Sequence, residues 1–179
     1  MQLFRFFSDK DHLCQFKCGH VRFTLLDFYK NTTEKSRHDQ QEGIGITQCK
    51  GVTHTSIFRN PTYILSTSTV SNEELRARFG NYVATISDGT EFLKRVNSAL
   101  PKYYIKYFKE VKSGLVNYTK SMEANGHIQA LDSILQKDHD YHEECEYRFY
   151  FISKETKPPF DHLEIKIEDP ESLISQGSF

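Results

Sequence analysis

The sequence predicts a sheet-rich α+β fold, and three observations support this prediction. The chain has 14 Phe and 10 Tyr residues, which favour β-strands because their rings pack well on a pleated, half-buried surface. Short apolar runs recur along the chain, as buried strands require. Amphipathic segments that begin with capping residues separate several of these runs and indicate short helices. With 179 residues, no internal repeat and no linker, we expect a single domain that spans residues 1–179.

Strands are predicted where apolar runs or two-residue alternation occur. These segments are Gln2–Phe7, Val21–Leu25, Gly45–Gly51, Thr53–Phe58, Tyr63–Leu65, Tyr82–Ile86, Lys102–Val111, Leu115–Lys120, Glu144–Ile152 and His162–Ile167. Helices are predicted where a capping residue precedes apolar side chains three or four positions apart. These segments are His12–Lys17, Asn72–Phe79, Glu91–Leu100, a stretch from Ile128 to Lys137 and a short terminal helix opened by Asp169 and Pro170. The polar stretch from Asn31 to Gly45 is predicted to be a long loop.

The charge and hydropathy of the chain argue against several functions. The net charge is -1 and the pI is about 6.7, which disfavours nucleic-acid binding through bulk charge and leaves only a local patch. The longest apolar runs are too short to cross a bilayer. The N-terminus lacks the charged and apolar regions of a signal peptide. We therefore expect a cytoplasmic protein without a membrane partner.

The four cysteines are Cys14, Cys18, Cys49 and Cys145, and their spacing fits no disulfide framework. Without an export signal, free thiols are the expected state. Cys14, Cys18 and His20 have the residue types of a zinc site, but no fourth ligand follows at a suitable spacing. We therefore expect no metal.

Arg5 is the single charge inside the apolar run from Gln2 to Phe7. Its guanidinium cannot lose its charge by deprotonation, so a buried position requires a partner. Either the side chain reaches solvent at the end of the strand, or it binds an anion or phosphate at a cleft.

Ser66, Thr67 and Ser68 follow the apolar strand that ends at Leu65. Three hydroxyls at the end of a buried strand need hydrogen-bond partners. They either cap the following helix or hold a ligand. Because Ser71 and Thr69 lie closer to the helix, one of these two is the expected cap, and the three hydroxyls remain for the other role.

The segment Glu144–Ile152 gives the clearest strand signal in the chain. Alternation predicts one face that points to the core and consists of Cys145, Tyr147, Phe149 and Phe151. It predicts a second face that consists of Glu144, Glu146, Arg148 and Tyr150. Two carboxylates on one face repel each other and raise one pKa, while the neighbouring arginine keeps at least one ionised. The alternative is an exposed strand face with an ordinary salt bridge.

Three local strings, in this order, resemble the arginine–serine–glutamate class of ADP-ribosyltransferases, the cholera-toxin-like branch. The strings are Leu3-Phe4-Arg5, Tyr63-Ile64-Leu65-Ser66-Thr67-Ser68-Thr69 and Glu144-Cys145-Glu146. The ending Glu144–Arg148 also resembles a group of small bacterial and phage proteins that carry Glu-x-Glu-Tyr-Arg on a late strand. The chain is thus similar to divergent intracellular relatives of the toxins. The implied fold is an ADP-ribosyltransferase-like split β-sandwich with short helices packed around it.

The resemblance implies that NAD is the substrate and assigns residues to its cleavage. Glu146 would stabilise the oxocarbenium-like ribose and hold its 2′-hydroxyl. Arg5 would bind the diphosphate. Ser66 would bind the ribose and orient Glu146, with Thr67 and Ser68 shaping the turn.

The resemblance also assigns residues to the nicotinamide and the acceptor. Phe79 or Tyr82 would stack on nicotinamide. Glu144 would meet the acceptor, and glutamate at this position is similar to the arginine-modifying members. Tyr141 would present an aromatic ring to the acceptor, and Arg148 is placed on the same side.

The implied function is an NAD-dependent mono-ADP-ribosyltransferase that transfers ADP-ribose to a macromolecule, either to a protein side chain or to a nucleic-acid base. Its role would be that of a toxin, or of a defence or counter-defence factor, with an antitoxin or inhibitor as a further partner. Two alternatives remain open. One is an NAD glycohydrolase, and the other is a non-catalytic module that binds a nucleotide or a partner on the same fold.

Overall fold

The computed structural model describes residues 1–31, 43–49, 52–57, 59–108, 110–118, 122–123 and 130–177. Within these ranges the fold is mixed α+β, with a mostly antiparallel sheet and few helices, as the sequence predicts. Most of the loop predicted from Asn31 to Gly45 lies outside the described residues, because 32–42 are not among them.

The strands are β1 (Leu3–Phe7), β2 (His20–Leu25), β3 (Ile44–Cys49), β4 (Val52–Ile57), β5 (Thr62–Ser68), β6 (Tyr82–Ile86), β7 (Lys112–Leu115), β8 (Met122–Glu123), β9 (Glu146–Ile152), β10 (His162–Lys166) and β11 (Ile174–Gln176). The helices are α1 (Lys10–Lys17), α2 (Leu26–Asn31), α3 (Glu73–Phe79), α4 (Gly89–Ser98) and α5 (Lys102–Ile105), with short 3-10 helices η1 (Ala130–Leu135), η2 (His139–Glu144) and η3 (Pro170–Ser172). Within the described ranges, no helix has the length and apolar character needed to span a membrane.

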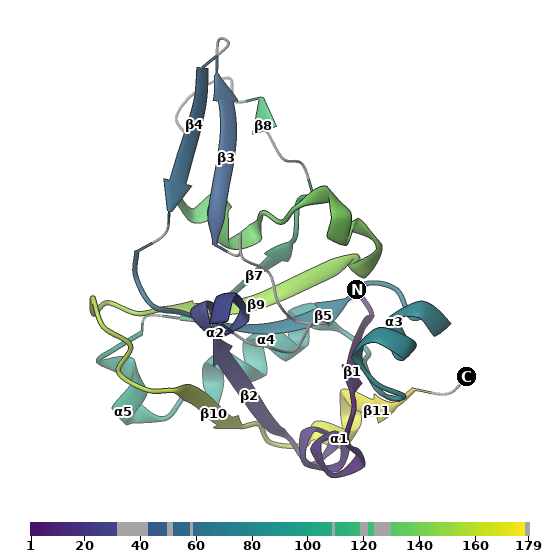
Figure 1. Cartoon of the computed structure of the whole chain (residues 1–179). Coiled ribbons are helices and arrows are strands. Elements are labelled where there is room, and N and C mark those ends of the chain that lie inside the picture. Colours follow the sequence, from purple (N-terminus) through teal and green to yellow (C-terminus); the bar gives the residue numbers. More distant parts are fainter. Residues whose placement is uncertain are drawn as a thin grey trace.

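The strands form a large and a small sheet (Figure 1). The large sheet has eight strands in the order β10-β2-β5-β1-β6-β11, with β9 paired to β5 and β7 paired to β9. All its neighbouring strands are antiparallel. The small sheet, in the order β4-β3-β8, projects from the rest of the chain, and β8 is parallel to β3.

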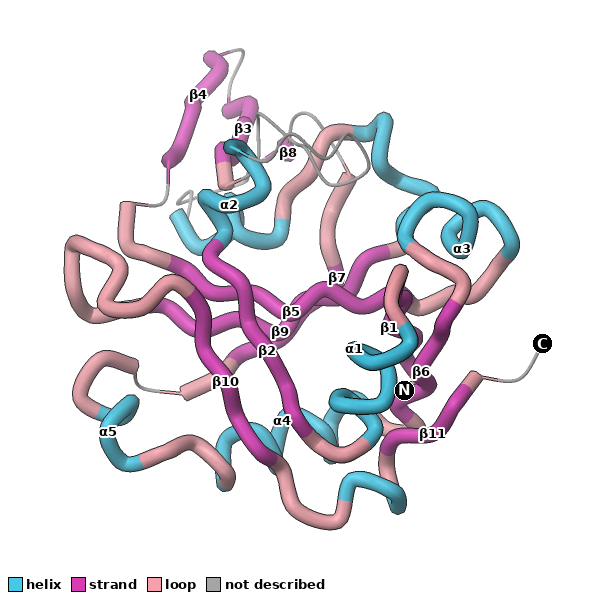
Figure 2. The backbone as a smooth tube through the Cα atoms, turned by 60° about the horizontal axis from the view of Figure 1, so that its bottom comes forward, coloured by secondary structure: helices cyan, strands magenta, loops and turns pink. Residues whose placement is uncertain are grey.

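The large sheet divides at β5. Strand β9 pairs with β5 along its whole length and occupies one of its two edges. The other edge is therefore shared by β2, which pairs at Tyr63 and Ile64, and by β1, which pairs at Ser68. Figure 2 shows β2 and β10 leaving β5 on one side, and β1, β6 and β11 on the other. Ser66 lies in the gap between the two halves.

The two faces of β5 and β9 have different roles. Residues opposite each other on antiparallel strands share a face, so Leu65 and Phe149 lie on one face while Ser66 and Arg148 lie on the other. The first face joins the main hydrophobic core, where the Phe149 ring lies 5.0 Å from that of Phe92 on α4. The predicted alternation of Phe149 is thus confirmed. The exposed-face alternative is wrong, because Arg148 has no exposed surface.

The segment predicted as the strand Lys102–Val111 is instead a helical turn, α5, followed by a loop. Alternation was misleading because its odd positions include two exposed side chains, Tyr103 and Ile105. The buried side chains are Tyr104, Phe108 and Val111, whose spacing of four and three fits a helical turn. The strand after this loop, β7, pairs with β9.

Several predicted ends and caps also differ. Asn72 caps α3 by accepting a hydrogen bond from the Leu75 N–H at 2.9 Å, so neither Ser71 nor Thr69 is the cap. Thr69 instead donates to the Cys145 carbonyl. The predicted helix before Lys137 and the predicted terminal helix are both short 3-10 helices in the described residues.

Gly80 is the residue at which alanine should be least tolerated. It ends α3 with a φ of 129°, a region that is essentially restricted to glycine, and an added Cβ would lie 2.1 Å from the Phe7 carbonyl oxygen. We expect Gly80→Ala to lower the free energy of unfolding by at least about 2 kcal/mol. Urea denaturation of the purified protein measures this change.

Gly177→Ala is the matched control. Gly177 is not among the described glycines with positive φ, and an added Cβ would come no closer than 3.2 Å to Val83. Its loss of stability should be clearly smaller. Equal losses in the two variants would contradict the role given to Gly80.

Candidate active site

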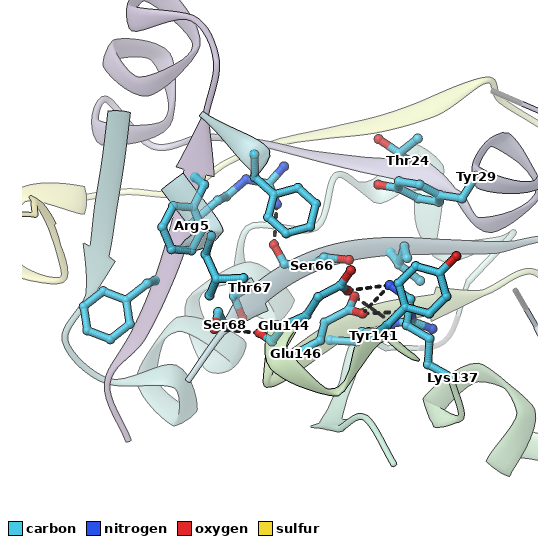
Figure 3. A pocket seen from close by; sticks show the side chains of 16 residues that line it. Arg5, Thr24, Tyr29, Ser66, Thr67, Ser68, Lys137, Tyr141, Glu144 and Glu146 are labelled. Atoms are coloured by element: carbon cyan, nitrogen blue, oxygen red, sulfur yellow. Dashed lines mark hydrogen bonds and ion pairs between the residues drawn. The ribbon is translucent and has the colours of Figure 1, made fainter. Parts of the chain in front are cut away.

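A pocket opens on the polar face of β5 and β9, beside the gap between β1 and β2 (Figure 3). Its volume is about 910 Å³, including the open space at its mouth. It is lined by Phe4, Arg5, Phe6, Thr24, Tyr29, Ile64, Ser66, Thr67, Ser68, Leu75, Phe79, Lys137, Tyr141, Glu144, Glu146 and Arg148. Figure 3 shows Arg5 and Ser66 on one side of the two glutamates, and Tyr141 and Lys137 on the other.

Glu146 and Arg148 form a buried ion pair at the floor of the pocket. Arg148 Nε and Nη2 donate to the two carboxylate oxygens of Glu146 at 2.8 and 3.0 Å. Arg148 Nη1 donates to the Ile134 carbonyl at 2.6 Å. Arg148 was expected at the acceptor side, but it has no exposed surface and supports Glu146 from behind.

Glu146 is held as a carboxylate. Its side chain is 6% exposed, and burial alone would raise its pKa. The charges of Arg148 and Lys137, with hydrogen bonds from Arg148 and Ser66, outweigh this effect and hold the pKa of Glu146 well below its usual range. The backbone N–H of Glu146 donates to the Tyr118 hydroxyl oxygen at 2.7 Å, which fixes the start of β9.

Glu144 lies near Glu146 but does not belong to the same strand. It ends η2, and Cys145 after it has a left-handed φ of 43°. The predictions that Glu144 shares a strand face with Glu146 and that Cys145 points to the core are therefore wrong. The turn brings both carboxylates to Lys137, whose Nζ lies 2.5 Å from Glu144 Oε2 and 3.4 Å from Glu146 Oε2.

The pKa of Glu144 is shifted in the opposite direction from that of Glu146. Burial and repulsion by Glu146 raise the pKa of Glu144, although Lys137 and Arg78 oppose this shift. Arg78 on α3 reaches the carboxylate at 3.0 Å. The pKa values of the two glutamates therefore differ, with Glu146 the more acidic and Glu144 the more basic. The sequence predicts a raised pKa for one of the two.

The Tyr141 ring contacts both cations that contact Glu144. Its ring centroid is 5.4 Å from Arg78 Cζ and 4.7 Å from Lys137 Nζ. Cation–π attraction at these distances holds both cations over the carboxylate. The ring lines the pocket, and both of these cations belong to this chain.

Arg5 closes the gap between β1 and β2. Its Nη1 donates to the Ser66 carbonyl at 2.6 Å. Along β5, Ser66 follows the residues that pair with β2 and precedes the residue that pairs with β1. Its guanidinium also lies 5.4 Å from the Phe7 ring and 5.8 Å from the Phe16 ring. Arg5 thus stands at the pocket wall and is half-buried.

The three hydroxyls divide into two roles. Ser66 contributes a hydrogen bond to Glu146. Thr67 donates to the Tyr147 carbonyl at 2.7 Å, and Ser68 donates to the Glu144 carbonyl at 2.8 Å. Thr67 and Ser68 therefore fix the backbone around Glu144 and Glu146, and Ser66 acts on the carboxylate itself.

The two aromatic residues proposed for nicotinamide are separated by Gly80 and Asn81. Phe79 lines the pocket. Tyr82 lies outside the pocket lining on β6, opposite Phe7 on β1, and is 37% exposed. The chain leaves α3 at Gly80 and enters β6, so Tyr82 does not line the pocket that Phe79 and the other predicted site residues line.

Sequence reasoning missed Lys137 and Arg78. A general signal existed, because two buried carboxylates require counter-charges. Nothing in the spacing indicated which of the basic residues would supply them, since Arg78 reaches Glu144 from a helix that is 66 positions away along the chain. In the described residues, no group of three or more metal-ligating side chains occurs. Comparisons with protein-family models, curated proteins and solved structures found no match.

The two glutamates should affect acid stability with opposite signs. Because the folded-state pKa of Glu146 is lowered, its stabilising contribution is present above about pH 4.3 and is lost as the pH falls further. We expect Glu146→Gln to cost about 3–5 kcal/mol at neutral pH, because it leaves buried cations without a partner. The difference in the free energy of unfolding between the wild type and Glu146→Gln should become smaller below about pH 4.3. Urea denaturation across this pH range measures it.

Glu144→Gln is the matched variant. Because the folded-state pKa of Glu144 is raised, the folded wild type binds more protons than the unfolded chain above about pH 4.3. The wild type should therefore gain stability relative to Glu144→Gln as the pH falls from neutral toward that value. Parallel pH profiles for the two variants would contradict the assigned environments.

Proposed function

We propose that this protein is an NAD-dependent mono-ADP-ribosyltransferase with an ADP-ribosyltransferase-like split β-sandwich fold. One observation carries the proposal. Arg5, Ser66 and Glu146 come from three strands that are far apart in the sequence, and they line one pocket. These are the residue types that the resemblance assigns to the diphosphate, the ribose and the cleaved bond.

The charge on Glu146 suits cleavage of the nicotinamide–ribose bond. As this bond breaks, its electron pair leaves on the nicotinamide nitrogen, which becomes neutral, and positive charge develops on the ribose. A carboxylate that is ionised before the reaction and held by Arg148 stabilises that charge without having to reorganise. Ser66 and Arg148 hold Glu146 in this state.

Glu144 suits the second half of the transfer. An electron pair of the acceptor forms a bond to ribose C1′, and the acceptor loses a proton. Because burial raises the pKa of Glu144, its carboxylate is the more basic of the two glutamates. We assign to Glu144 the uptake of this proton, which then passes to water.

The gap between β1 and β2 is the proposed binding site of the NAD diphosphate. An arginine fork matches two phosphate oxygens, and Arg5 lies at the gap between β1 and β2, where neither of these two strands pairs with Ser66. In this proposal the diphosphate lies against Arg5, the ribose lies beside Ser66 and Glu146, and nicotinamide lies near Phe79.

Nicotinamide release from NAD by the purified protein tests the proposal. We expect the wild type to release nicotinamide, and Glu146→Gln to lower kcat about 100-fold or more. Glu164→Gln makes the same change at an exposed position on β10 and should have no effect. Release without label transfer to lysate would indicate a glycohydrolase. Absence of both release and NAD binding in the wild type would defeat the enzyme proposal.

Phe79 and Tyr82 give a second test. We expect Phe79→Leu to raise KM for NAD several-fold with little change in kcat, because it removes a binding contact that does not change during the reaction. Tyr82→Leu should leave both constants unchanged, since Tyr82 lies outside the pocket. Steady-state kinetics with NAD measure both. The reverse pattern would place nicotinamide elsewhere.

A further inference from the structure

The charges around Glu144 restrict the acceptor, and this inference rests on the proposed function. Arg78 lies 3.0 Å from one carboxylate oxygen of Glu144, and Lys137 lies 2.5 Å from the other. A guanidinium acceptor would need the same two oxygens, because its fork binds a carboxylate through two parallel hydrogen bonds. Both positions are taken by cations of this chain.

Among the described residues, each of the two buried carboxylates already contacts two cations. Arg78 and Lys137 contact Glu144, and Lys137 and Arg148 contact Glu146. A further cation would meet repulsion from side chains within a few ångströms, in a region where burial weakens screening by water and salt. An uncharged group meets no such repulsion.

Displacement of the resident cations is also unfavourable. The side chain of Lys137 is 10% exposed, and it contacts both carboxylates. Its departure would leave two buried negative charges without this counter-ion. Tyr141 holds Lys137 and Arg78 in place through its ring, so the cations are fixed from a third direction.

We propose that Lys137 and Arg78 are specificity-determining residues that exclude guanidinium and ammonium acceptors, so that the acceptor nucleophile is an uncharged group. In the transfer, the C1′–nicotinamide bond breaks with its electron pair on nicotinamide. An electron pair of an uncharged oxygen, sulfur or nitrogen then forms the new bond, and its proton goes to Glu144. The proposal differs from the expectation that glutamate at position 144 marks an arginine-modifying enzyme.

Agmatine, a small guanidinium compound, is the probe. The wild type should release nicotinamide at the same rate with and without agmatine, and no ADP-ribosylated agmatine should form. Lys137→Met removes the cation that both glutamates share. In this variant, agmatine should stimulate release about tenfold or more relative to the rate without agmatine, because one repulsive charge is gone.

Three further variants isolate the role of charge. Lys137→Arg keeps the charge and should gain no use of agmatine. Lys102→Met makes the same change as Lys137→Met at an exposed position on α5 and should behave as the wild type. Arg78→Met frees the other oxygen of Glu144. This variant replaces Lys137→Met in the test if Lys137→Met does not fold. A gain in Lys137→Arg as large as in Lys137→Met would overturn the inference.

Agmatine binding, measured by calorimetry without NAD, separates this inference from the proposed function. Lys137→Met should bind agmatine, and the wild type should not. Binding to the wild type, or modification of agmatine by it, would overturn the inference and leave the enzyme proposal standing. Absence of nicotinamide release, with agmatine binding confined to the Lys137→Met variant, would overturn the enzyme proposal and retain the cation exclusion.

Discussion

The buried guanidinium of Arg148 is the constraint on which the site depends. A charge with no exposed surface must be fully paired, since breaking a buried pair costs about 3–5 kcal/mol. Two of its nitrogens hold Glu146, and the third holds the Ile134 carbonyl in η1. Gly114, opposite Arg148 on β7, leaves room for Leu135 of η1, because a Cβ there would lie 2.6 Å from the Leu135 side chain. The same η1 segment leads directly to Lys137.

Because Arg148 pairs with Glu146, the environments of the two neighbouring glutamates differ. Glu146 begins β9 in front of Arg148 and stays ionised, while Glu144 ends η2 and is separated from it by the left-handed turn at Cys145. Ser68 ties the Glu144 backbone to β5. The fold thus places two carboxylates whose pKa values are shifted in opposite directions next to each other, and Lys137 contacts both.

Much of this arrangement could be predicted from the sequence, because it depends on strands with strong local patterns. The strands around Arg5, Leu65 and Phe149 were predicted from apolar runs, and the resemblance joined their polar residues into one site. Predictions failed where tertiary contacts decide the outcome. Alternation around Tyr104 concealed a helical spacing of buried residues, and a left-handed turn takes Glu144 off the strand on which it was predicted. The partners of Glu144 come from distant segments that no local pattern connects.

A crystal structure of Glu146→Gln with NAD tests the central claim most directly, because this variant should slow the cleavage and so leave bound NAD intact. The account predicts the diphosphate against Arg5, and the nicotinamide ribose within hydrogen-bonding distance of Ser66 and of the side chain at position 146. NAD bound at another surface, or a pocket that stays closed at saturating NAD, would contradict it.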